Sequence, residues 1–160
     1  MKRRIHCAML IPLLAVLCIV MSSCAPDKQR NETISMQALY DTITRGAALP
    51  DMVTLDSASV EDYYGISQEM YTDYVCYAAT DGLLADEVML IRAKDQAVGK
   101  QISALLADHL VYRQNEMRDY LPEQYALLQD ATLAEKNLVI ALIVSSDGQK
   151  INSAFQKALP

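Results

Sequence analysis

The sequence is poor in the residues from which catalytic and metal sites are usually built. Its 160 residues include two histidines, four cysteines, five glycines, one phenylalanine and no tryptophan. It contains no His-Glu-x-x-His pair, no paired cysteine spacing, no acidic calcium loop, no Gly-x-Ser-x-Gly elbow and no glycine-rich phosphate loop. We therefore expect no metal site, no cofactor and no catalytic residues, and the sequence favours a non-enzymatic protein.

Positive charge is also scarce. Lysine and arginine number 14 against 20 aspartates and glutamates, so the formal net charge is −6 at pH 7. An acidic protein is repelled by phosphate backbones and by anionic headgroups, which excludes nucleic acid as a partner. Any attachment to a membrane must therefore come from something other than a basic face.

The longest hydrophobic run lies at the N-terminus. A basic head, residues 1–4, is followed by an apolar stretch from Ile5 to Met21, which is the pattern of a secretory signal. The ending Met-Ser-Ser-Cys at residues 21–24 resembles the lipobox of bacterial lipoproteins. It predicts a lipoprotein signal peptide over residues 1–23 and lipidation of Cys24. The alternatives are ordinary secretion or an uncleaved anchor, for which a span of about 17 residues lies at the lower limit.

Cleavage before Cys24 has consequences for charge, thiols and location. It would leave 11 basic against 20 acidic residues, a formal net charge of −9, and Cys76 as the single free thiol, which excludes an intramolecular disulfide. Residues 24–34 would form the lipidated cysteine and a flexible tether, at most roughly 35 Å long, and residues 35–160 a single domain. We expect this domain on the extracytoplasmic face of the cell membrane. The lipid anchor would contact the membrane, and an envelope protein or cell-surface polymer would be the partner.

Periodicity and turn residues predict an α+β fold for the mature chain. We expect a small antiparallel sheet of about three to four strands with helices packed on one face, including one long helix near 95–120. The pattern at residues 60–64 is ambiguous. The other expected helices span 35–45, 122–130 and 149–159, and the expected strands span 52–55, 74–79, 87–92 and 138–144.

Arg113 is out of place on the long predicted helix. At about 100° per residue it falls in the middle of the apolar stripe formed by Ile102, Leu106, Leu110 and Met117. A guanidinium in that position needs an acceptor or a route to solvent. It could build an anion site, form a buried ion pair or extend past the sheet edge. Its plausible partners are Asp86 and Glu87, of which only one should face the helix because successive strand residues point to opposite sides.

Tyrosines are the second unusual feature. Nine occur in the chain, and five of them fall within residues 63–77. Exposed tyrosines suit stacking on sugars or on a partner protein, so Tyr64, Tyr74 and Tyr77 are candidate binding residues; the alternative is a half-buried structural layer. Cys76 and His109 could pair as nucleophile and base, or Cys76 could be a small apolar strand residue and His109 a helix residue near the core.

Several short segments, taken in order, resemble the bacterial lipoprotein family of domain of unknown function 4358. They are Tyr64-Gly65-Ile66, Ala85-Asp86-Glu87-Val88, Arg113-Gln114, Tyr120-x-Pro122-x-Gln124 and Val144-Ser145-Ser146-Asp147. The resemblance covers roughly residues 35–157 and implies an envelope location with no established activity. It includes Glu87 and Arg113 without assigning them a role.

Three hypotheses for function follow from these features. The first is a non-enzymatic interaction or scaffold module, which requires an exposed tyrosine patch and no deep polar pocket. The second is a binding module that captures a small anion or an envelope saccharide with Arg113. The third is an enzyme, which requires an exposed Cys76 or a serine beside a base.

Overall fold

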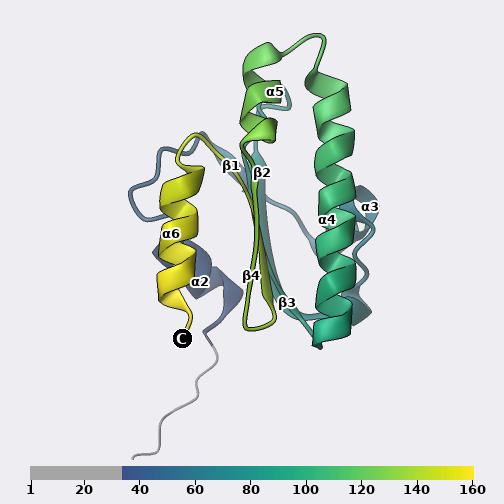
Figure 1. Ribbon diagram of the computed structural model, residues 1–160, viewed down its shortest axis with the longest axis vertical. Helices are drawn as coiled ribbons and strands as arrows, with labels where there is room; N and C mark the ends of the chain where they lie inside the picture. Colours follow the sequence, from purple (N-terminus) through teal and green to yellow (C-terminus); the bar gives the residue numbers. More distant parts are fainter. Residues whose placement is uncertain (1–33) are drawn as a thin grey trace, which may run out of the picture. The chain divides into compact units, whose positions relative to one another are not determined.

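The computed structural model describes residues 34–160 and contains a five-stranded antiparallel sheet between two layers of helices (Figure 1). The strands are ordered β1-β2-β3-β5-β4. Their bounds are Met52–Thr54, Tyr71–Ala79, Glu87–Ala93, Thr132–Lys136 and Val139–Val144 for β1 to β5. The α-helices are α2 Met36–Ile43, α3 Ser57–Tyr64, α4 Gln96–Met117, α5 Pro122–Gln129 and α6 Gly148–Ala158, and a short 3-10 turn, η1, spans Gln68–Met70.

Helices cover both faces of the sheet. On one face α4 packs with α3 and α5 over a core that includes Met89, Ile91, Ile102 and Leu106. On the other face α2 and α6 cover a second core. The fully buried side chains of β5, which alternate between the two cores, explain why this strand reads as an unbroken apolar run. The described residues of both cores lie within one compact unit, Thr33–Pro160.

The predicted α+β class, the antiparallel sheet and the long helix are confirmed. The sheet has five strands rather than three to four, and helices pack on both of its faces rather than one. The sequence predicted helices at the positions of α2 and α6. It did not predict that these two helices would cover the second face of the sheet. Within the described residues, no helix is long and apolar enough to span a membrane.

Capping residues determine where two of the helices on the first face, α3 and α4, begin. Asp95 accepts a hydrogen bond from the Val98 amide at 2.9 Å and starts α4. Asp56 does the same for α3 through the Ser59 amide, also at 2.9 Å. Gly65 ends α3 with a φ of 68°, a left-handed conformation that glycine adopts without steric cost. The ambiguous stretch at residues 60–64 is therefore the second half of a capped helix.

The predicted signal peptide over residues 1–23 and the lipidated Cys24 lie outside the described residues, as does most of the predicted tether. The chain enters the described domain at Ile34. The carbonyl oxygen of Ile34 accepts a hydrogen bond from Nη2 of Arg92 at 2.8 Å, near the C-terminal end of β3. The amide of Met36 donates to Asp73 Oδ2 at 2.8 Å, which fixes the start of α2 on β2.

Candidate functional site

A cleft of about 330 Å³ lies between the C-terminal half of α4, the end of α3 and the edge of the sheet formed by β1 and β2. Its apolar wall comes from Val53, Leu55 and Ala78. Its polar residues come from β3 and α4, and we call it the Glu87 cleft after the most deeply buried of them. The volume lies within the range of small-molecule sites in proteins.

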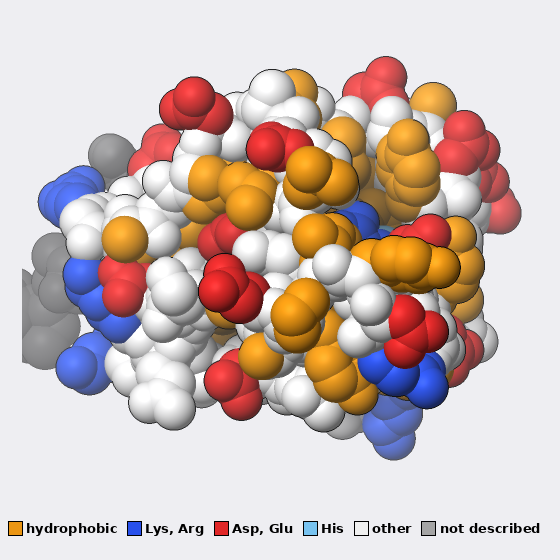
Figure 2. Space-filling view, turned by 90° about the horizontal axis from the view of Figure 1, so that it is seen from above, with side chains coloured by type: hydrophobic (Ala, Val, Ile, Leu, Met, Phe, Trp, Pro, Cys, Tyr) orange, Lys and Arg blue, Asp and Glu red, His pale blue; other side chains and the backbone are white. Residues whose placement is uncertain are grey.

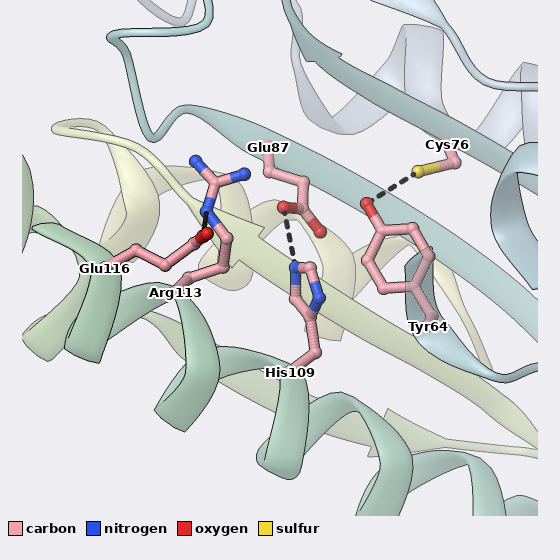
Figure 3. A network of polar contacts seen from close by, with 6 residues as sticks. All are labelled: Tyr64, Cys76, Glu87, His109, Arg113 and Glu116. Atoms are coloured by element: carbon pink, nitrogen blue, oxygen red, sulfur yellow. Dashed lines mark hydrogen bonds and ion pairs between the residues drawn. The ribbon is translucent and has the colours of Figure 1, made fainter. Parts of the chain in front are cut away.

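Glu87 and His109 form a buried pair at the floor of this cleft (Figure 3). Oε2 of Glu87 lies 3.3 Å from Nε2 of His109, and the two side chains are only 4% and 7% exposed. The other carboxylate oxygen, Oε1, has no hydrogen-bond partner among the described residues. A carboxylate held out of water normally satisfies both oxygens, so Glu87 retains unused acceptor capacity inside the cleft.

Arg113 occupies the same cleft one helical turn after His109. Its Nε is buried and has no hydrogen-bond partner in the described part of the chain. The nearest carboxylate oxygen, Oε2 of Glu116, lies 3.9 Å away, which is an ion-pair distance but too long for a hydrogen bond. The arginine side chain is 25% exposed, so it reaches from the helix face toward solvent while keeping an unused donor.

Tyr64 closes the inner side of the site. Its ring lies against the imidazole of His109 with the centroids 4.3 Å apart, and its hydroxyl shares a 3.5 Å hydrogen bond with the Cys76 thiol (Figure 3). Burial raises the pKa of the Tyr64 hydroxyl far above its usual range, and the nearby Glu87 carboxylate adds to this rise. Burial likewise raises the pKa of the Cys76 thiol, again with help from Glu87. Both groups are therefore neutral at physiological pH.

Exposed rings flank the mouth of the cleft. Tyr63 is 67% exposed and Tyr112 is 61% exposed, and both line the cleft. Figure 2 looks onto the domain end at the top of Figure 1, where hydrophobic side chains are gathered around a basic side chain and among acidic ones. The site therefore combines a polar floor with an aromatic mouth.

The structure brings three of the five predicted binding residues together. Tyr64, Glu87 and Arg113 all line the Glu87 cleft. Of the two carboxylates considered as partners for the helix, Glu87 is the one that contacts α4, although through His109. The prediction that Arg113 lies on the buried side of α4 holds for its Nε.

Tyr74 and Tyr77 lie elsewhere. Tyr74 packs against Tyr71 with a ring separation of 5.0 Å and lines a different hollow beside Leu55. Tyr77 points to the opposite face of the sheet, where it stacks on Tyr40 at 4.1 Å. The alternation of side chains along a strand separates Tyr77 from the cleft, because neighbouring residues face opposite sides.

Cys76 and His109 do not form a nucleophile–base pair. In the described part of the chain the thiol's hydrogen-bond partner is Tyr64, and the imidazole's partner is Glu87. The thiol is buried and neutral, whereas an activated cysteine has a lowered pKa. The interpretation of Cys76 as an apolar strand residue therefore fits its surroundings.

Sequence reasoning missed His109 as the partner of Glu87, and it missed the contributions of Tyr112 and Glu116. The four-residue spacing between His109 and Arg113 puts both on one helix face and was the available signal. No sequence pattern marked Tyr112 and Glu116. These residues line the cleft because α3 and β1 pack close to α4, and that arrangement is not visible in the sequence.

These features define an α+β domain with one polar, aromatic-rimmed cleft beside its long helix. The chain belongs to the family described as Domain of unknown function (DUF4358), whose model matches residues 46–145. No curated protein and no solved structure matches the chain. The segments that carried the resemblance also meet in space: the Ala85 amide donates to Gln124 Oε1 at 2.8 Å, close to where Tyr64, Glu87 and Arg113 meet.

Proposed function

We propose that this protein is a cell-envelope lipoprotein whose domain is a non-enzymatic binding module, with the Glu87 cleft as its ligand site. One observation carries the proposal. A buried carboxylate with a free acceptor and an arginine with a free donor line the same cleft. Native structures rarely leave such groups unsatisfied, and each instance requires an explanation such as a ligand.

The distribution of the tyrosines favours this binding role over a scaffold role. A scaffold surface would require the tyrosines of residues 63–77 to form an exposed patch. Instead Tyr64 and Tyr71 are buried, and the exposed Tyr63 lines the cleft. The cleft, with Glu87 and His109 buried at its floor, is a polar pocket of a kind that a flat interaction surface would lack.

Binding is also favoured over catalysis. A nucleophilic thiol needs an electropositive, accessible environment that lowers its pKa. Cys76 is buried, and both burial and the Glu87 carboxylate raise its pKa. The His109 imidazole faces Glu87 and the Tyr64 ring. These contacts suit a rigid floor for a ligand rather than a proton shuttle to a nucleophile.

The position of the cleft suits a tethered domain. Ile34, where the chain enters the domain, is hydrogen-bonded to Arg92. Glu87 lies five residues earlier on the same strand, about 17 Å away. A tether from Cys24 would therefore join the described domain at the end of β3 opposite Glu87.

Thermal-shift screening of residues 34–160 tests the proposal. The library should contain sugars, amino acids, carboxylates and phosphates. We expect at least one class to raise the melting temperature of the wild type, because a ligand that binds only the native state stabilises it. Arg113→Met should lose the shift, whereas Arg118→Met, at the exposed C-cap of the same helix, should keep it. No shift with any class, or equal shifts in both variants, would overturn the proposal.

A further inference from the structure

We infer that the ligand of the Glu87 cleft is an uncharged, hydroxyl-rich saccharide unit rather than a free anion. This inference rests on the proposed function and specifies its chemistry. Three independent features of the cleft bear on it: the unused hydrogen-bond groups, the balance of charge, and the rings at the mouth.

The unused hydrogen-bond groups are of opposite kinds. Oε1 of Glu87 can only accept a hydrogen bond, and Nε of Arg113 can only donate one. A hydroxyl group does both, so a sugar can donate to Glu87 through one hydroxyl and accept from Arg113 through the same or the next one. A carboxylate ligand has no proton for Glu87 and would leave that oxygen unsatisfied.

The charge of the cleft also disfavours an anion. Two carboxylates, Glu87 and Glu116, accompany the guanidinium of Arg113, and the imidazole of His109 faces Glu87. Arg113 is already partly neutralised by Glu116 at 3.9 Å. An anion placed near Arg113 would also face the buried carboxylate of Glu87, and repulsion between like charges is stronger in a buried site than in water. An uncharged ligand avoids this repulsion.

The rings at the mouth suit the flat, weakly polar faces of a sugar. Tyr63 and Tyr112 each expose more than half of their surface and line the same cleft. Tyrosine offers flat apolar area with a hydroxyl at its tip, which matches a pyranose ring carrying C–H groups on its face and hydroxyls at its edge. At about 330 Å³, the cleft has room for one or two such rings.

A glycan array probed with fluorescently labelled residues 34–160 tests the inference. We expect binding to neutral oligosaccharides, followed by calorimetry with the strongest of them. Affinity should change less than about twofold when NaCl is raised from about 0.05 M to about 0.5 M, because salt screens attraction between charges and not hydrogen bonds to a neutral sugar.

Cleft variants should reduce this affinity selectively. We expect Glu87→Gln, Arg113→Met and Tyr112→Ala each to weaken binding by about tenfold or more, since each removes a hydrogen bond to a charged group or an aromatic contact. Arg118→Met and Tyr120→Ala, at exposed positions outside the cleft, should stay within about twofold. If Glu87→Gln fails to fold, the partly exposed Arg113 and Tyr112 still carry the test.

The outcomes separate the two proposals. Binding only to acidic glycans, free phosphate or an amino acid, lost in Arg113→Met, would overturn the saccharide inference and leave the binding function standing. Neutral-glycan binding that the cleft variants do not weaken would overturn the inference as well. No binding to any neutral glycan by a folded wild-type domain would also overturn it, while failure with every ligand class would overturn the proposed function itself.

Discussion

Among the described residues, the buried carboxylate of Glu87 has one hydrogen-bond partner, Nε2 of His109 at 3.3 Å, and the Tyr64 hydroxyl lies close to it. Burial of a charged or polar group without full compensation costs several kcal/mol in general, so this residue is a poor choice for stability alone. A neutral or apolar side chain of similar size would fill the same space at lower cost. The presence of Glu87 is better explained by a ligand that supplies the missing donor.

The thiol of Cys76 gives the first prediction. Because burial and Glu87 raise its pKa, the native state holds the neutral thiol, and the thiolate forms readily only after unfolding. The raised pKa means that the neutral thiol contributes fully to the stability of the folded domain below the usual thiol pKa. This contribution is lost as the pH rises above about 9, because the thiol of the unfolded chain then ionises more readily than that of the folded domain. In residues 34–160, iodoacetamide at pH 8 should modify Cys76 only at the rate of protein opening, as followed by mass spectrometry.

The same domain in denaturant provides the control and should be modified completely, because Cys76 is its only cysteine. Rapid stoichiometric modification of the folded domain would contradict the buried neutral thiol. It would also reopen the hypothesis of a cysteine-dependent enzyme.

At the scale of elements, the β4–β5 hairpin was not predicted, and its sequence shows why. Thr-Leu-Ala-Glu-Lys at Thr132–Lys136 is rich in helix-forming residues and lacks strand alternation. It forms a strand because it pairs with β5, Lys136 opposite Val139, across the two-residue turn Asn137–Leu138. Both turn residues have positive φ, 50° and 65°, as a type I′ turn requires. Long-range pairing therefore overrides local propensity here.

Leu138 is the strained residue of this turn and gives the second prediction. A left-handed conformation costs an L-residue with a Cβ roughly 1–2 kcal/mol, while glycine adds about 0.5–1 kcal/mol of unfolded-state entropy. Leu138→Gly should therefore raise the free energy of unfolding by about 0.5–1 kcal/mol, measured by urea titration. Leu138→Ala is the matched control, since it keeps the strain and should give no gain. A loss of stability in Leu138→Gly would mean that the leucine side chain contributes more than its backbone costs.

The helix and the strand that carry the site could be predicted from the sequence, whereas most of the contacts between them could not. The helix around Arg113 and the strand that begins at Glu87 follow from local periodicity and capping, which the sequence displays directly. The pairing of Glu87 with His109 depends on how α4 crosses β3, and the contribution of Tyr112 depends on how α3 approaches α4. The way in which two elements cross leaves no local pattern in the sequence. The pairing of His109 with Glu87 and the position of Tyr112 at the mouth could therefore not be predicted.

At the scale of the whole domain, stability and binding are served by different regions. Two apolar cores on the two faces of the sheet, built around β3 and β5, hold the fold together. The polar groups of the Glu87 cleft lie at one end of this framework, and the chain enters at the other. The cores can therefore support an energetically unfavourable site, as commonly found where a protein binds a ligand.

The central claim, that Glu87 serves a ligand and not the fold, is tested most directly by the unfolding free energy of Glu87→Gln in residues 34–160. Glutamine keeps the size of the side chain and can still hydrogen-bond His109, but it does not bury a charge. We expect this variant to be at least as stable as the wild type in urea titrations without ligand. Loss of about 3 kcal/mol or more, the usual cost of breaking a structural buried ion pair, would contradict the account.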